Sequence, residues 1–129
     1  MFKSLKNQKG QTLVEVLAGL GLILIVVTAL IGMGIVALKA STSARNRTVA
    51  AKLANEGMEI ARSKRDQDGL STVVDVSDDV TVGSVTFTRE RVVSGPDPTK
   101  KKTIVVTVSW PESSGTKTAS VTSYLTDWR

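Results

Sequence analysis

One carboxylate, Glu15, stands in an otherwise apolar stretch near the start of the chain. It is the only ionisable side chain between Lys9 and Lys39. A carboxylate at the edge of an apolar segment is costly to bury unless it is paired. Gly10 ends a short basic leader, and a cut after this small residue would create an α-ammonium group at Gln11. An ion pair between that ammonium and Glu15 of a second packed copy would offset the cost of burial and set the register of the two copies. The simpler alternative is that Glu15 only marks a membrane interface.

The element that must position Glu15 is a long apolar helix. Residues 16–38 form a run of 23 positions without a charged side chain. A helix of that length spans roughly 35 Å, enough for a bilayer core of about 30 Å. The rest of the chain is too small to surround an all-apolar helix. A secretory signal is cut after its apolar region. Here the small residue precedes that region, so the apolar segment is expected to stay with the mature protein.

An amphipathic stretch continues the helix over residues 39–65. No Pro or Gly pair separates it from the apolar run, so the pattern predicts one helix from Thr12 to Arg65. Asp66–Gly69 is expected to end this helix, with Gly69 as its cap. The predicted buried face consists of Val49, Leu53 and Ile60, with Ala50, Ala54 and Ala61 beside them.

Beyond Leu70 the composition changes to Val, Thr and Ser with period-two alternation. Gly- and Pro-containing turns separate the alternating runs. The sequence therefore predicts an α+β fold, in which the helix packs on a small antiparallel sheet of three or four strands. Lys100–Lys102 form a basic run that we expect in a solvated loop.

Composition excludes several kinds of site. The chain has 129 residues and a net charge of +5, which falls to +2 without the three lysines of residues 1–10. Bulk charge therefore argues weakly for nucleic acid as a partner. There is no cysteine and no histidine, which removes disulfides, thiolate metal ligands and the commonest general base. No nucleophile–base pair and no phosphate-binding loop is apparent. We therefore expect no enzyme, no cofactor and no metal site.

The segment Lys9-Gly10-Gln11-Thr12-Leu13-Val14-Glu15 resembles the prepilin leader of type IV pilins and type II secretion pseudopilins. The usual pattern there is Gly, Phe, Thr, Leu, a variable residue and Glu. Gly10, Thr12, Leu13 and Glu15 match it at the family's spacing, whereas Gln11 stands in place of Phe. The resemblance implies cleavage after Gly10 by a membrane aspartyl prepilin peptidase and methylation of the new amine on Gln11.

The resemblance also implies a division of the chain. Residues 1–10 would be the cleavable leader, residues 11–38 the transmembrane and assembly half of the helix, and residues 39–129 a pilin-like globular domain. Pilins often carry a helix-breaking proline at about the depth of Gly32 and Gly34, and their helix extends locally on assembly. These two glycines could provide that flexibility, or they could serve close helix packing.

Residues 54–62 and the final strands are similar to minor pilins and pilus-modification proteins. The resemblance implies a structural subunit, a minor pilin of a type IV pilus or related filament. Its partners would be the prepilin peptidase, other pilin subunits and an inner-membrane assembly platform. The chain would cross the cytoplasmic membrane once, with its N-terminus in the cytoplasm, before it joins a cell-surface or periplasmic filament. A type II secretion pseudopilin, a monomeric membrane-anchored binding module and a DNA-capture protein are the alternatives.

Overall fold

The computed structural model describes residues 8–97 and 100–127. A single helix, α1 (Gln8–Asp68), is followed by a short 3-10 turn, η1 (Leu70–Thr72), and then by strands only. The prediction of one continuous helix is confirmed, with bounds slightly wider than Thr12–Arg65. The strands are β1 (Val76–Val82), β2 (Val85–Asp97), β3 (Lys101–Glu112) and β4 (Gly115–Thr126).

The chain divides into two compact units between Thr42 and Ser43. In the N-terminal unit, residues 1–42, every described residue belongs to α1. The C-terminal unit, residues 43–129, holds the second half of α1 and the four strands. The core of the protein lies in this second unit.

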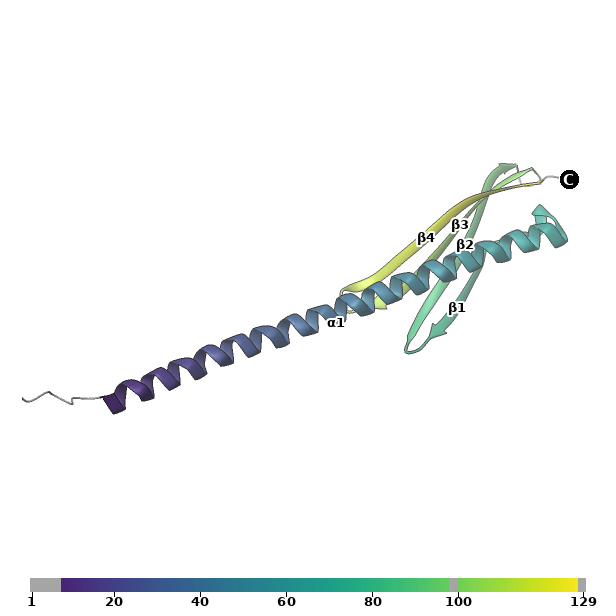
Figure 1. Ribbon diagram of the computed structural model, residues 1–129. Helices are drawn as coiled ribbons and strands as arrows, with labels where there is room; N and C mark the ends of the chain where they lie inside the picture. The colour runs from purple at the N-terminus through teal and green to yellow at the C-terminus, as the bar shows by residue number, and fades with distance from the viewer. Residues whose placement is uncertain (1–7, 98–99, 128–129) are drawn as a thin grey trace, which may run out of the picture. The chain divides into compact units, whose positions relative to one another are not determined.

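The sheet is an antiparallel meander in which each strand pairs with the next, in the order β1-β2-β3-β4. The longest ladder joins β3 and β4 and runs from the Lys101–Thr126 pair to the Glu112–Gly115 pair. In the C-terminal unit the sheet lies along α1 (Figure 1). One helix packed on one face of an antiparallel sheet is the predicted α+β arrangement, and the structure confirms it with four strands.

The core forms where a stripe of small and apolar residues on α1 meets the inner face of the sheet. Alternation places the inward side chains of the strands on that face, and several of them are fully buried. On the helix the buried side chains follow the period of about 3.6 residues. Ile60 was wrongly predicted to be buried, since 44% of it is exposed. The buried core comprises Ala50, Leu53, Ala54, Met58, Ala61, Leu70, Val73, Phe87, Ile104, Val106, Val108, Trp110 and Leu125.

Gly57 allows α1 to approach the centre of the sheet. A Cβ atom at this position would lie 3.0 Å from Cδ of Arg89 and 3.0 Å from Cγ1 of Val106. Both distances are shorter than ordinary van der Waals contact. Val106 is fully buried in the core and Arg89 is held by an ion pair, so neither side chain can easily move away. A side chain at position 57 would therefore strain the packing of the helix on the sheet.

Gly57→Val is expected to destabilise the C-terminal unit by about 1–3 kcal/mol, because overpacking a well-filled core costs that much. The gain in helix propensity on replacing Gly by Val is under about 1 kcal/mol and does not compensate. Thermal unfolding of the detergent-solubilised chain, followed by tryptophan fluorescence, measures the loss. Asn55→Val, at an exposed position of the same helix, is the matched control. Equal stability of the two variants would contradict the close-packing role of Gly57.

Gly69 ends the long helix, as the sequence predicted. Its backbone N–H donates a hydrogen bond to the carbonyl oxygen of Arg65 at 2.9 Å. Its φ of +95° lies in a region that side chains other than Gly rarely adopt. The chain then turns through η1, and Val73, which follows it, is buried in the core.

Candidate functional site: the leader junction and the apolar helix

The proposed cleavage junction lies at the start of α1. The helix begins at Gln8, so the peptide bond between Gly10 and Gln11 lies within its first turn. The first turn of a helix lacks intrahelical partners for its N–H groups and frays readily. A glycine there lowers helix stability by about 1 kcal/mol relative to Ala. The backbone at this bond is therefore expected to open more easily than the interior of α1.

Glu15 lies one turn beyond that junction and is exposed. Leu13, Val14, Val16 and Leu17 surround it in sequence and are 59–65% exposed. Among the residues that the structure describes, no ion pair involves Glu15. A carboxylate on such an apolar surface needs a cationic partner when the surface enters lipid or protein. Within the described part of the chain, the carboxylate of Glu15 is thus exposed and not paired with a cation.

The apolar span presents large hydrophobic side chains on all sides of the helix. Within the described part of the chain, α1 is the one helix long and apolar enough to cross a membrane. The hydroxyl of Thr28 donates to the backbone carbonyls of Leu24 at 3.0 Å and Ile25 at 2.9 Å, so this polar group needs no partner from solvent. The exposed hydrophobic residues of this span include Leu20, Leu22, Ile23, Leu24, Ile25, Leu30, Ile31, Met33, Val36 and Leu38.

Gly32 and Gly34 lie within an unbroken part of this helix. A Cβ atom at either position, or at Gly19 and Gly21, would meet nothing within 4 Å. Their small size therefore serves no contact among the residues that the structure describes. Both predicted roles, close packing against another helix and local extension on assembly, depend on partners and stay predictions.

Glu112 joins the end of β3 to the first residue of α1 in the C-terminal unit. Its Oε1 accepts a hydrogen bond from Nε1 of Trp110 at 2.9 Å, and its Oε2 accepts one from Oγ of Ser43 at 3.2 Å. The Trp110 bond is the main cause that lowers the pKa of Glu112, and the Ser43 bond and the charges of Lys117 and Arg47 add to it. The ionised carboxylate therefore helps to hold the helix to the sheet.

Acidification is expected to weaken this attachment. Because the folded pKa is below the ordinary value of 4.5, the stabilisation is complete above that value and is lost as the pH falls through the lowered one. Wild-type stability should therefore fall more steeply below about pH 4.5 than that of Glu112→Gln. Urea unfolding of the detergent-solubilised chain at several pH values measures the slopes. Glu59→Gln, at an exposed helix position, should keep the wild-type slope, and identical slopes for all three would contradict the role of Glu112.

Three cations lie on the inner face of the sheet, where the sequence analysis did not expect them. Arg89 pairs with Asp78 at 2.5 Å and with Glu56 at 3.6 Å, and the hydrogen bond to Asp78 is the main cause that raises its pKa. Arg91 is 6% exposed, and its Nε donates to the carbonyl of Val74 at 3.1 Å.

Lys102 is the third of these cations. It is 8% exposed, and its Nζ donates to the carbonyl oxygens of Val73 at 2.9 Å and Ser71 at 3.3 Å. The prediction that Lys100–Lys102 form a solvated loop is therefore wrong for this residue, and β3 already begins at Lys101. Lys102 and Arg91 together hold the connection between η1 and β1 against the sheet.

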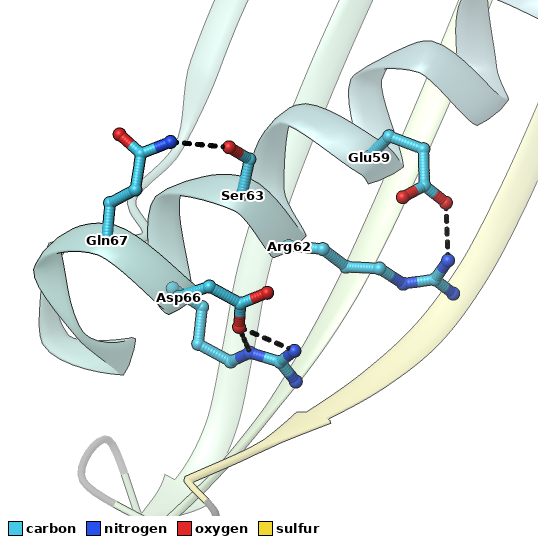
Figure 2. A network of polar contacts seen from close by, with 6 residues as sticks. Glu59, Arg62, Ser63, Asp66 and Gln67 are labelled. Carbon is cyan, nitrogen blue, oxygen red and sulfur yellow. Dashed lines mark hydrogen bonds and ion pairs between the residues drawn. The ribbon is translucent and has the colours of Figure 1, made fainter.

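The last turns of α1 carry local polar pairs on their exposed side (Figure 2). Arg62 pairs with Glu59 at 2.5 Å, and Arg65 pairs with Asp66 at 2.8 Å. Exposed pairs of this kind contribute about 0–1 kcal/mol each. Their importance here is that they neutralise both arginines locally. In residues 8–97 and 100–127, no group of three or more Asp, Glu, His or Cys side chains could hold a metal ion.

Comparison with known protein families gives a match at the N-terminal end of the chain. Residues 5–31 match the family model described as the prokaryotic N-terminal methylation motif. The matched segment contains the junction at Gly10, the carboxylate Glu15 and much of the apolar span. No curated protein and no solved structure matches the chain. The match confirms the resemblance of the leader that the sequence analysis described.

Proposed function

We propose that this prepilin-like, membrane-anchored chain, which carries the leader motif of type IV pilins, is a structural subunit of a type IV pilus or related filament. One observation carries the proposal. The leader motif directly precedes an apolar helix whose side chains the single chain leaves exposed on every side. Before assembly lipid can cover this surface, and in a filament the helices of neighbouring subunits can replace the lipid.

Maturation would begin with hydrolysis of the peptide bond between Gly10 and Gln11 by a prepilin peptidase. Water adds across that bond, so the leader keeps a carboxylate on Gly10 and the mature chain gains an α-amine on Gln11. A sulfonium methyl donor would then transfer a methyl group to the nitrogen of this amine, which releases a proton and stays basic, while the donor leaves as a thioether. The family model's description supports this second step, although Gln11 stands where pilins usually have Phe.

The new ammonium would then meet Glu15 of a neighbouring subunit. Bringing two charges out of water is costly, and their attraction repays the cost only when the geometry and hydrogen bonding are good. A pair that forms at one axial offset and at no other therefore selects the register of neighbouring helices. The exposure of Glu15 supports this role, because its carboxylate is open to a neighbouring subunit.

The remaining parts of the chain fit the same scheme. Residues 39–129 would form the globular domain outside the membrane, and the leader would remain in the cytoplasm until it is removed. Gly32 and Gly34 would let α1 extend locally as the subunit leaves the bilayer. An inner-membrane assembly platform and other pilin subunits would be its partners.

A minor pilin is our first assignment, on the similarity of residues 54–62 and the final strands to that group. A type II secretion pseudopilin would share the leader, the helix and the α+β fold. A monomeric membrane-anchored binding module would share the helix but would leave Glu15 without an assembly partner.

N-terminal mass spectrometry of sheared filaments tests the proposal. We expect the chain in the filament fraction with an N-terminal peptide that begins at Gln11 and carries one added methyl group. Recovery of the processed chain only from membranes, with no oligomer on cross-linking, would favour the tethered binding module and contradict the filament subunit.

A further inference from the structure

A groove lies between the second half of α1 and the edge strand β1. Its volume is about 340 Å³, and both Ile60 and Val76 line it. Ile60 is 44% exposed and Val76 is 40% exposed, so two large apolar side chains face solvent at this groove. Side chains of this kind are favourable to cover when a complementary surface is available.

The groove also carries more positive than negative charge, and two of its cations have no acidic partner in the described part of the chain. Lys64, Arg89 and Arg91 line the groove, together with the single acid Asp78. Asp78 already forms an ion pair with Arg89. Within the described residues, neither Lys64 nor Arg91 pairs with a carboxylate, and only Nε of Arg91 has a partner, the carbonyl of Val74. The terminal nitrogens of a guanidinium can bind a carboxylate through two parallel hydrogen bonds.

The cations of α1 that lie near Lys64 in sequence differ from it, because each has an acidic partner. Arg62 and Arg65 are neutralised by Glu59 and Asp66 (Figure 2). The groove is therefore a place in the C-terminal unit where cations, one of them almost fully buried, accompany exposed apolar side chains.

A complementary surface exists on the opposite face of the same sheet. Glu90 and Val92 are neighbours on the outward side of β2, and Asp79 lies on the same side of β1. Val92 is 44% exposed, and Val105 stands opposite it on β3. Within the described residues, no ion pair involves Glu90 or Asp79. This outer patch, which we define as Asp79, Glu90, Val92 and Val105, is negative and partly apolar, whereas the groove is positive and partly apolar.

We propose that the outer patch of one copy of this chain docks in the α1–β1 groove of a second copy, with Glu90 against Lys64 and Arg91, and Val92 against Ile60 and Val76. The inference rests on the proposed function, and it applies where copies of this chain lie next to one another in the filament. Patch and groove lie on opposite faces of the sheet, so a copy that fills its neighbour's groove leaves its own groove open. A contact between two different surfaces is head-to-tail, so it can repeat from copy to copy and build an open filament, whereas a contact of one surface with itself closes a dimer.

Charge reversal tests the contact in sheared filaments from a strain that lacks the native copy. Lys64→Glu and Glu90→Lys, each introduced into the complete gene product, should each lower the amount of the chain in filaments about tenfold. Each change places like charges face to face. The variant that carries both changes should recover most of the wild-type amount, since the pair is restored with opposite polarity. Lys52→Glu, at an exposed helix position outside the groove, should remain at the wild-type amount.

Cysteine cross-linking locates the contact directly, because the chain contains no cysteine of its own. Cells that express Ile60→Cys together with Val92→Cys should yield a cross-linked dimer in filaments. The same Ile60→Cys with Thr48→Cys should yield none, because Thr48 lies outside the patch and groove.

The outcomes separate the inference from the proposed function. A wild-type chain present in filaments without charge rescue and without the cross-link would overturn this contact and leave the filament role intact. A cross-link from Ile60→Cys to a different pilin would show that a second copy is not the occupant, and it would also overturn the inference. A wild-type chain that never enters filaments would overturn the proposed function, and the docking contact with it.

Discussion

Gly10→Leu is expected to leave the chain at its precursor length, with residues 1–10 still attached. We propose that cleavage at this junction requires the first turn of α1 to open and the residue before the cut to be small. Leucine fills the space that glycine leaves, and it also stabilises the helical turn by about 1 kcal/mol relative to Gly. Mass spectrometry of the membrane-extracted protein gives the result, since the precursor keeps the ten leader residues. Processing should fall from near completion to a trace.

Gly19→Leu is the matched control for this experiment. Gly19 lies in the same helix, and a Cβ atom there would meet nothing within 4 Å. The control should be cleaved as the wild type is, whatever its later assembly. If Gly10→Leu also yields a chain that begins at Gln11, the peptidase does not read this glycine and the proposed junction is wrong.

Glu15→Ala is expected to remain in the membrane in normal amount and to be almost absent from filaments. Insertion depends on the apolar span, and loss of a charge makes insertion easier. Assembly, in contrast, would leave the ammonium of a neighbour buried without a partner. Breaking a buried pair costs about 3–5 kcal/mol. A loss of 3 kcal/mol corresponds to roughly a hundredfold drop in the assembled amount.

Glu15→Asp should retain part of the assembly, because it keeps the charge on a shorter side chain. Glu59→Ala removes an acid from an exposed pair on the same helix and should assemble normally, because exposed pairs contribute at most about 1 kcal/mol. The ratio of filament to membrane protein is the measurement, in a strain without the native copy. Wild-type assembly of the alanine variant would show that Glu15 marks only the membrane interface.

Much of the helix and the sheet could be predicted from the sequence because their patterns are simple. The charge-free run and the absence of helix-breaking residues gave α1, and alternation around Phe87, Val106 and Trp110 gave the inner face of the sheet. The helix face was less accurate. Bulky residues drew the prediction to Ile60, whereas the tight approach to the sheet selects the small residue Gly57 and its neighbour Met58.

The buried cations were missed for a related reason. Arg89 and Arg91 lie at every second position between Phe87 and Val93, so the alternation alone places them on the same inner face. Charged residues ordinarily face water, so alternation alone is a weak signal for a buried arginine. What reverses it is a set of partners distant in sequence, such as Asp78 for Arg89 and the carbonyl of Val74 for Arg91. A single sequence contains no signal for these partners until the register of the strands is known.

The order of the strands has a consequence for how the C-terminal unit folds. Each strand pairs with its immediate successor, so every ladder of the sheet closes only a short loop. Docking of α1 instead joins residues far apart in sequence, as the approach of Gly57 to Val106 shows. Local contacts form faster than distant ones. The hairpins are therefore expected to form first and the helix to dock afterwards. A newly inserted chain would then complete its domain only when the helix segment beyond the membrane is free to meet the sheet.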